Sequence, residues 1–171
     1  MKKITPINNK NLESLNVVIE IPMDGSPVKY EIDKDSGLLA VDRFLPVAMS
    51  YPCNYGFLPN TLGNDGDPLD ILLVTRYPVI PGSLVKSRAI GVLLMEDESG
   101  MDEKILAVPN EKLDVSYKYI RDISDLCARL KDRIVHFFEH YKDLEKEKWV
   151  KVKGWGNLDE AKKIIKNSIN N

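Results

Sequence analysis

The chain has 171 residues, 43% of them hydrophobic, which predicts one globular domain covering residues 1–171 with a sizeable core. Its 24 Lys and Arg against 26 Asp and Glu give a formal net charge of -2, which argues against nucleic-acid or membrane-surface binding. No apolar run approaches the ~20 residues of a membrane-spanning helix, and the polar start lacks the apolar stretch of a signal peptide. Only Cys53 and Cys127 are present, in no C-x-x-C pair, so we expect a soluble protein of the reducing cytoplasm.

Short apolar segments separated by Pro, Gly and Asp predict a mainly β region from Val17 to about Leu113. Val17–Ile21 and Val28–Ile32 alternate apolar and polar residues, as half-buried strands do. The other expected strands are 38–41, 70–75, 84–95, 104–108 and, after a helical stretch, 148–153. A small barrel would leave none of these strands with an unpaired edge.

The hydrophobic period changes to three and four residues in the last third of the chain. This period predicts an amphipathic helix that follows the N-cap candidates Asp122 and Ser124 and ends near Lys142. Asn157 and Glu160 then have the spacing of a capping box that opens a final helix. The predicted fold class is therefore α+β, mainly β, with two main helices in the C-terminal half.

Three carboxylates, Asp65, Asp67 and Asp70, lie within six residues around Gly66 and Pro68. Such close negative charges repel one another, so either solvent separates them, as in an ordinary Asp-Gly turn, or cations bind them. Carboxylates of this kind suit hard cations such as Mg²⁺, Mn²⁺ or Ca²⁺. The loop is not an EF-hand, because it lacks the Gly at position 6 and the Glu at position 12. We expect a divalent metal site here.

A second acidic group, Asp97 to Asp102, follows a long apolar strand and reads as a wide hairpin. Alone it is typical of a charged hairpin tip in water. Together with Glu20 and Glu31 on polar strand faces, it supplies enough carboxylates for more than one metal. Two neighbouring cations can activate a water and neutralise the charges of a phosphoryl group, so this set of carboxylates favours phosphoryl chemistry.

Cationic and hydroxyl side chains that suit a phosphate accompany these carboxylates. They are Lys29, Arg43, Tyr51, Tyr55, Lys104, Tyr141 and Lys142. Taken one at a time, each is typical of a surface residue, and a Lys at a helix end is favoured by the helix dipole alone. The chain contains neither the G-x-x-x-x-G-K-[ST] nor the G-x-G-x-x-G motif, so side chains and metals would have to hold the phosphate.

The segment His136 to His140 fits the H-x-x-E-H pattern of a zinc peptidase on a predicted helix. The chain that follows is too short for a peptidase lobe with a third ligand, so we favour a different role. Because the two histidines share one helix face, we favour a pair that packs or hydrogen-bonds at the helix surface.

From about Glu20 to Trp155, the chain resembles the soluble family I inorganic pyrophosphatases of bacteria. The segment Asp65-Gly66-Asp67-Pro68-Leu69-Asp70 fits the family signature D-x-D-[PE]-x-D. The tyrosine-rich segment Tyr51–Gly56 and the second acidic group add to the likeness in order and spacing. The resemblance implies an OB-like five-stranded closed β-barrel flanked by helices, and a homohexamer. With that assembly and their shared helix face, we expect His136 and His140 to contribute to a subunit contact that weakens at acidic pH.

The resemblance also implies a role for each candidate residue. The implied metal ligands are Asp65, Asp70, Asp97, Asp102, Glu20 and Glu31, with Mg²⁺ as the metal, several ions per subunit, and Mn²⁺ as a substitute. The implied phosphate-binding residues are Lys29, Arg43, Tyr55, Lys104, Tyr141 and Lys142. Asp67 would be the general base for a water that attacks pyrophosphate in line, without a covalent intermediate. The alternatives are another metal-dependent phosphohydrolase and, from a different class, an OB-like nucleic-acid-binding module.

Overall fold

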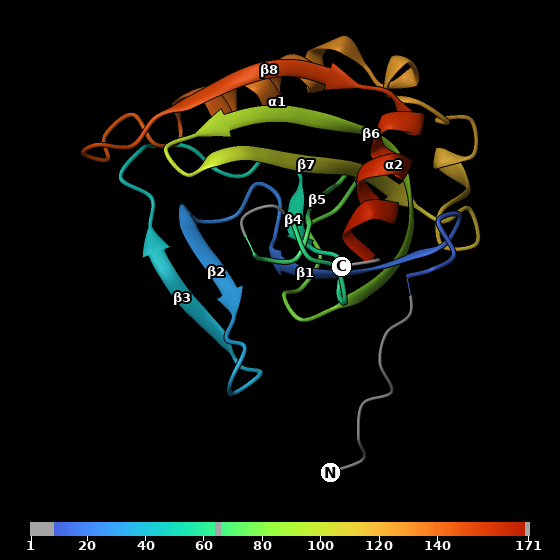
Figure 1. Cartoon of the computed structure of the whole chain (residues 1–171), viewed down its shortest axis with the longest axis horizontal. Helices are drawn as coiled ribbons and strands as arrows, with labels where there is room; N and C mark the ends of the chain where they lie inside the picture. The colour runs from blue at the N-terminus through green and yellow to red at the C-terminus, as the bar shows by residue number, and fades with distance from the viewer. Residues whose placement is uncertain (1–8, 64–65, 170–171) are drawn as a thin grey trace.

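The computed structural model describes residues 9–63 and 66–169, and the chain in these ranges is mainly β (Figure 1). The strands are β1 (Leu15–Ile21), β2 (Val28–Ile32), β3 (Leu39–Phe44), β4 (Asn54–Phe57), β5 (Asp70–Leu73), β6 (Leu84–Asp97), β7 (Gly100–Pro109) and β8 (Val150–Gly156). The helices are the 3-10 turns η1 (Val115–Tyr117) and η2 (Ile123–Asp125) and the α-helices α1 (Ala128–His140) and α2 (Leu158–Ile169). The two α-helices lie in the C-terminal half, as predicted.

Five strands close into a ring. The main sheet has the order β1-β4-β5-β7-β6-β8, and a further pairing joins β1 to β6. All neighbours are antiparallel except β5 and β7, which run parallel. The ring β1-β4-β5-β7-β6 confirms the predicted five-stranded closed sheet, and β8 extends it beside β6.

Strands β2 and β3 form a separate two-stranded sheet, which Figure 1 shows standing beside the ring. Their antiparallel register places Lys29 opposite Arg43. Several apolar side chains of β3 remain exposed, among them Val41 at 51% and Phe44 at 74%. The hairpin therefore has little core of its own, and it is attached to the ring at a limited set of contacts.

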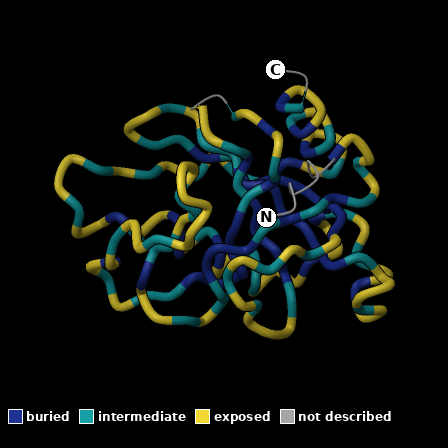
Figure 2. The backbone as a smooth tube through the Cα atoms, turned by 90° about the horizontal axis from the view of Figure 1, so that it is seen from below, coloured by how far each residue is buried: buried dark blue, intermediate teal, exposed yellow. Residues whose placement is uncertain are grey.

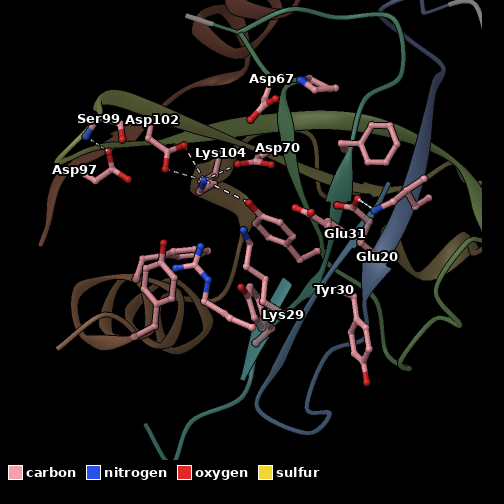
Figure 3. Close-up of a pocket in the computed structure, with 18 of the residues that line it drawn as sticks. Glu20, Lys29, Tyr30, Glu31, Asp67, Asp70, Asp97, Ser99, Asp102 and Lys104 are labelled. Carbon is pink, nitrogen blue, oxygen red and sulfur yellow. Dashed lines mark hydrogen bonds and ion pairs between the residues drawn. The ribbon is translucent and has the colours of Figure 1, made fainter. Parts of the chain in front are cut away.

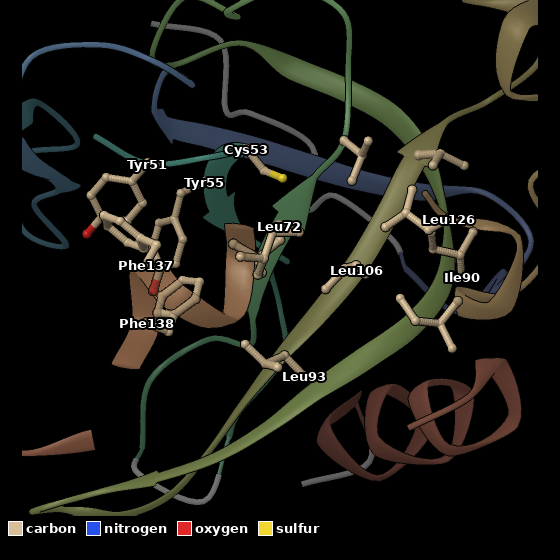
Figure 4. Close-up of a cluster of buried hydrophobic side chains, with 14 of the residues drawn as sticks. Tyr51, Cys53, Tyr55, Leu72, Ile90, Leu93, Leu106, Leu126, Phe137 and Phe138 are labelled. Atoms are coloured by element: carbon tan, nitrogen blue, oxygen red, sulfur yellow. The ribbon is translucent and has the colours of Figure 1, made fainter. Parts of the chain in front are cut away.

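Buried side chains form two clusters, one on each face of the ring strands. Within β5, Ile71 and Leu73 belong to the cluster that contacts α2, whereas Leu72 belongs to the cluster that contacts α1. Residues 105–108 of β7 alternate in the same way. Because both faces of these parallel strands are covered, their sequence is a continuous apolar run. Figure 2 shows the buried backbone gathered in the interior, and Figure 4 shows the cluster that includes Leu72.

Strand β4, which the sequence did not predict, lies unusually close to β1. A Cβ added to Gly56 would stand 1.9 Å from the carbonyl oxygen of Val18, so only glycine allows this approach. The neighbouring Asn54 is fully buried, and its side chain bonds the backbone N–H groups of Met23 and Val79. The strand is thus defined by tertiary packing rather than by alternation of its residues.

The start of α1 was predicted too early. Asp122 caps the 3-10 turn η2 rather than α1, in a capping box with Asp125. Leu126 is then extended, and α1 begins at Ala128 after Cys127. In contrast, the predicted capping box of α2 is confirmed, with reciprocal bonds of 2.9 and 3.0 Å between Asn157 and Glu160.

The hairpin of β6 and β7 is tight rather than wide. Asp97 pairs directly with Gly100, so the strands continue into the second acidic group and only two residues turn between them. Gly100 has a φ of 122°, a backbone conformation that suits glycine. No helix in the described part of the chain is long and apolar enough to cross a membrane.

Candidate active site

A cavity of about 1060 Å³ lies between the ring, the β2–β3 hairpin and the segment that follows α1. Its lining includes every candidate side chain that the structure describes. These are Glu20, Lys29, Glu31, Arg43, Tyr51, Tyr55, Asp67, Asp70, Asp97, Asp102, Lys104, Tyr141 and Lys142. The remaining candidate, Asp65, lies outside the described residues. Residues far apart in the sequence therefore meet in one place.

Lys104 stands at the centre of the carboxylates that come from the ring. Its Nζ lies 2.6 Å from Asp70 Oδ2 and 2.6 and 2.8 Å from the two oxygens of Asp102, as Figure 3 shows. The parallel register of β5 and β7 places Asp70 directly opposite Lys104. The Lys104 side chain is only 4% exposed, whereas those of Asp70 and Asp102 are 27% and 18% exposed, so the ammonium is removed from water while its two carboxylates keep part of their contact with it.

Burial and charge act against each other in this cluster. Burial alone would lower the pKa of Lys104, but Asp70 and Asp102 outweigh it and hold that pKa well above its usual value. For Asp102, burial raises the pKa more than Lys104 lowers it, and the net pKa is raised. Lys104 is therefore a permanent cation, whose charge the two carboxylates balance.

Aromatic side chains support the floor of the cavity. The hydroxyl of Tyr55 lies 3.4 Å from Lys104 Nζ. The ring of Tyr51 packs between Tyr55 and Phe137, with centroid distances of 5.2 and 4.7 Å, and Phe137 stacks on Tyr141 at 5.3 Å. Burial raises the pKa of both Tyr55 and Tyr141, so both hydroxyls stay protonated and can donate hydrogen bonds.

Lys142 contacts the second acidic group from the end of α1. Its Nζ lies 2.8 Å from Asp97 Oδ2 and 3.3 Å from Glu98 Oε1. Burial raises the pKa of Asp97, but Lys142 and the N–H of Ser99 outweigh it and hold that pKa below its usual value. Asp97 is thus ionised near neutral pH, as a metal ligand must be.

Glu20 reaches the cavity from β1 and accepts a bond of 2.7 Å from the N–H of Ile32. The residue is only 8% exposed, and this burial raises its pKa to about 7. Glu31 lines the same cavity from β2. Because the contact between Glu20 and Ile32 joins β1 to β2, it also fixes the hairpin to the ring.

The hairpin carries two of the phosphate-binding candidates. Lys29 Nζ and Arg43 Nε both contact Asp42 Oδ2, each at 2.9 Å. Burial raises the pKa of Asp42, but the two cations outweigh it and lower that pKa. Lys29 is 29% exposed and Arg43 33% exposed, so these charges remain in contact with water.

Asp67 lies at the rim of the cavity and is paired with a residue that the sequence did not single out. Lys34, in the turn after β2, places its Nζ 2.5 Å from Asp67 Oδ1, with the two side chains 70% and 64% exposed. Lys148 is another cation of the cavity that sequence reasoning missed. Nothing in the sequence pattern separates Lys34 or Lys148 from ordinary surface lysines.

The donor atoms fit a hard divalent cation, although they do not form a complete cluster. Five of the six predicted ligands line the cavity and offer carboxylate oxygens, which Mg²⁺ prefers. Within residues 9–63 and 66–169, however, no three His, Cys, Asp or Glu side chains are grouped closely enough to hold an ion. Two of the ligands, Asp70 and Asp102, already converge on one cation, the ammonium of Lys104.

The histidine pair lies elsewhere. The rings of His136 and His140 are 4.7 Å apart, and His140 Nδ1 lies 2.8 Å from Asp143 Oδ2. Neither histidine lines the cavity. In the part of the chain that the structure describes, these rings belong to no group of three His, Cys, Asp or Glu side chains that could hold a metal ion.

Known proteins resemble this chain in both sequence and structure. Residues 17–171 match the family described as inorganic pyrophosphatase. A protein named inorganic pyrophosphatase from Rickettsia typhi is 64% identical over 159 residues, which cover 93% of this chain and 89% of that protein. A protein of the same name from Rickettsia prowazekii is 62% identical over 169 residues, which cover 99% of this chain and 97% of that protein.

A solved structure of an inorganic pyrophosphatase from Helicobacter pylori has a TM-score of 0.94 and 52% identity, with 99% of this chain and 98% of that chain covered. The likeness thus extends over nearly the whole chain, including the ring of strands. The sequence resemblance noted above is confirmed, and the chain belongs to the inorganic pyrophosphatase family.

Proposed function

We propose that this chain hydrolyses inorganic pyrophosphate to two orthophosphates, as its family membership implies. One observation carries the proposal: a single cavity brings together carboxylates that suit metal ions and cations that suit phosphate oxygens. Pyrophosphate bound with divalent metal ions needs both, because the metals require anionic ligands and the substrate requires cationic ones. The substrate would lie between the carboxylates of the ring and the cations of the hairpin.

The family consists of metal-dependent hydrolases, and we propose Mg²⁺ as the metal, several ions per subunit, with Mn²⁺ as a substitute. The residues that would hold it are Asp65, Asp70, Asp97, Asp102, Glu20 and Glu31. Bound there, the metal would polarise the attacking water and neutralise charge on the phosphate oxygens. Asp97 supports this role because its lowered pKa keeps it ionised.

Asp67 is the proposed general base. It would take a proton from the water that attacks one phosphorus atom, and the leaving phosphate would depart in line on the opposite side. The proposed substrate-binding set neutralises that leaving phosphate and comprises Lys29, Arg43, Tyr55, Lys104, Tyr141 and Lys142. The protonated hydroxyls of Tyr55 and Tyr141 donate hydrogen bonds to phosphate oxygens.

We further propose that the chain is a single domain that works in the cytoplasm as a homohexamer. The cysteines support a reducing compartment, because Cys53 and Cys127 are both free. Exposed apolar residues such as Phe44 and Val115, at 74% and 70%, support burial against further subunits.

A phosphate-release assay tests the function directly. Purified protein with Mg²⁺ and pyrophosphate should release phosphate rapidly, and a chelator should abolish the release. The same assay with ATP and with a phosphomonoester distinguishes a broader phosphohydrolase, which would cleave these at comparable rates. Titration of labelled single-stranded DNA and RNA at low salt checks the nucleic-acid alternative. A protein inert toward magnesium pyrophosphate would contradict the proposal.

A further inference from the structure

A line of alternating charges runs from the hairpin to the segment that follows α1. Asp42 contacts both Lys29 and Arg43, as described above. On its other side, Arg43 Nη1 donates to Glu145 Oε2 at 3.0 Å, and the same oxygen pairs with Lys148 Nζ at 2.8 Å. The three cations line the cavity, whereas the two carboxylates that hold them do not.

Glu145 is an unusual residue for such a place. Its side chain is only 16% exposed, and its Oε1 is buried without a hydrogen-bond partner among the described residues. Burial raises the pKa of Glu145, but Lys148 and Arg43 outweigh it, so the net pKa is lowered and the side chain is ionised. A buried carboxylate with an unpaired oxygen is unfavourable for folding, so stability alone does not explain this residue.

The contact fixes the guanidinium of Arg43 in one orientation. Its Nε donates a hydrogen bond to Asp42 and its Nη1 donates one to Glu145, while Nη2 has no hydrogen bond to any described residue. Because the guanidinium is a rigid planar fork, holding two of its nitrogens determines where the third one lies. The backbone N–H of Glu145 also donates to the carbonyl of Lys142 at 2.9 Å. Glu145 thus contacts the two segments that supply Arg43 and Lys142.

We infer that Glu145 is a positioning residue for the substrate-binding cations. By joining Arg43 of the hairpin to Lys148 of the segment after α1, it holds both cations at the cavity and keeps Nη2 of Arg43 available for a phosphate oxygen. The inference rests on the proposed pyrophosphate hydrolysis and adds to it a residue that does not itself touch the substrate. Accurate placement of such a cation determines how well the substrate binds, because a small displacement weakens its contact with a phosphate oxygen.

The test compares Glu145→Ala with Glu96→Ala. Glu96 pairs with Lys153 at 2.6 Å, outside the cavity, so its loss removes an ion pair but leaves the site intact. We expect Glu145→Ala to lower kcat/KM about tenfold, mainly through a higher KM. Glu145→Gln, which keeps an acceptor without the charge, should fall between wild type and Glu145→Ala. Glu96→Ala should stay within about twofold of wild type. Loss of folded protein would lower the apparent kcat without raising KM.

A double-mutant cycle separates positioning from a general structural role. In an Arg43→Met background, Glu145→Ala should lower kcat/KM by less than it does in wild type, because one of the two cations that it positions is already absent. An equal loss in both backgrounds, or an unchanged KM in Glu145→Ala, would overturn the inference while leaving the proposed function in place. A wild-type protein that does not cleave pyrophosphate would overturn both.

Discussion

The cavity has two unlike walls. The sheet wall consists of Tyr55, Asp70, Asp102 and Lys104, which project from the ring, and its lysine is only 4% exposed. The hairpin wall consists of Lys29, Glu31 and Arg43, which project from β2 and β3, and its two cations are about one third exposed. The lysine of the sheet wall is balanced by its carboxylates away from water, whereas the cations of the hairpin wall are screened by water. Similar residue types thus have different energetic roles on the two walls.

The largest effect should come from Asp67→Asn, at the rim where the walls meet. Removal of the proposed base should lower kcat by about 10³-fold, which is within the range for general base catalysis. Asp35→Asn is the control, because Asp35 lines the same cavity from the hairpin turn and has no proposed role in proton transfer. Phosphate release measures both variants, and Mn²⁺ titration should show that Asp67→Asn still binds metal. Equal losses in the two variants would remove Asp67 from proton transfer.

Substitution of the lysines should distinguish the walls by stability. Lys104→Met leaves Asp70 and Asp102 facing each other without a cation, so the free energy of unfolding should fall by about 3 kcal/mol. Lys29→Met breaks only a partly exposed pair with Asp42 and should lower the free energy of unfolding by less than about 1 kcal/mol. Urea unfolding of the metal-free proteins in EDTA measures both values. Similar losses would contradict the proposed difference between the walls.

Glu20 should make the metal-free protein less stable as the pH rises, because burial raises the pKa of this carboxyl from 4.5 to about 7. Below pH 4.5 the carboxyl is protonated in both folded and unfolded chains, so it has no effect on stability. Between pH 4.5 and about pH 7 the folded chain holds a proton that the unfolded chain has lost. The free energy of unfolding therefore falls as the pH rises, and the loss is complete above about pH 7. The free energy of unfolding should fall by an amount on the order of 1–3 kcal/mol.

Urea unfolding in EDTA from pH 4 to 8 measures this effect, and Glu20→Gln should flatten the curve. The variant keeps an acceptor for the N–H of Ile32 but cannot ionise. A variant whose stability follows the same pH curve as wild type would show that another group is responsible.

The smallest effect on catalysis should come from His140→Gln, since His140 lies outside both walls. Activity at pH 7.5 should change less than about twofold, as for most substitutions away from a site. Because the proposed subunit contact includes the adjacent rings of His136 and His140, whose centroids are 4.7 Å apart, we expect the proposed assembly to dissociate in acid more readily in wild type than in the variant. Sedimentation at pH 7.5 and 5.5 checks this, and an identical response would remove His140 from the assembly contact.

Sequence patterns predicted those elements whose local signal agrees with their tertiary environment. The alternation in 17–21 and 28–32 corresponds to β1 and β2, and the Asn157 capping box opens α2 as expected. Strand β4 has no alternation, since Asn54 is buried by bonds to distant backbone groups. The start of α1 was misplaced because Asp122 is an equally good cap for a 3-10 turn. Local propensity alone does not distinguish these cases.

Much of the candidate site could be predicted as a set of residue types, but the sequence did not reveal how they pair. The carboxylates and cations expected from the sequence line one cavity, apart from the undescribed Asp65. The contact of Lys104 with Asp70 depends on strand register, and that of Lys34 with Asp67 on the position of the hairpin. No sequence pattern marked Glu145 as a candidate, because its partner Arg43 lies 102 residues away. Such contacts follow from the fold rather than from any short motif.

Asp70 and Lys104 come from neighbouring parallel strands, so their ion pair forms only when β5 and β7 pair in the correct register during folding. A slip of one residue between β5 and β7 would move Lys104 away from Asp70 and bring Glu103 or Ile105 opposite it. The buried ion pair would then be lost together with the order of the apolar side chains, so a misaligned chain is both unstable and inactive. Insertions or deletions inside these two strands should consequently be far less tolerated than changes in the loop that joins β5 to β6.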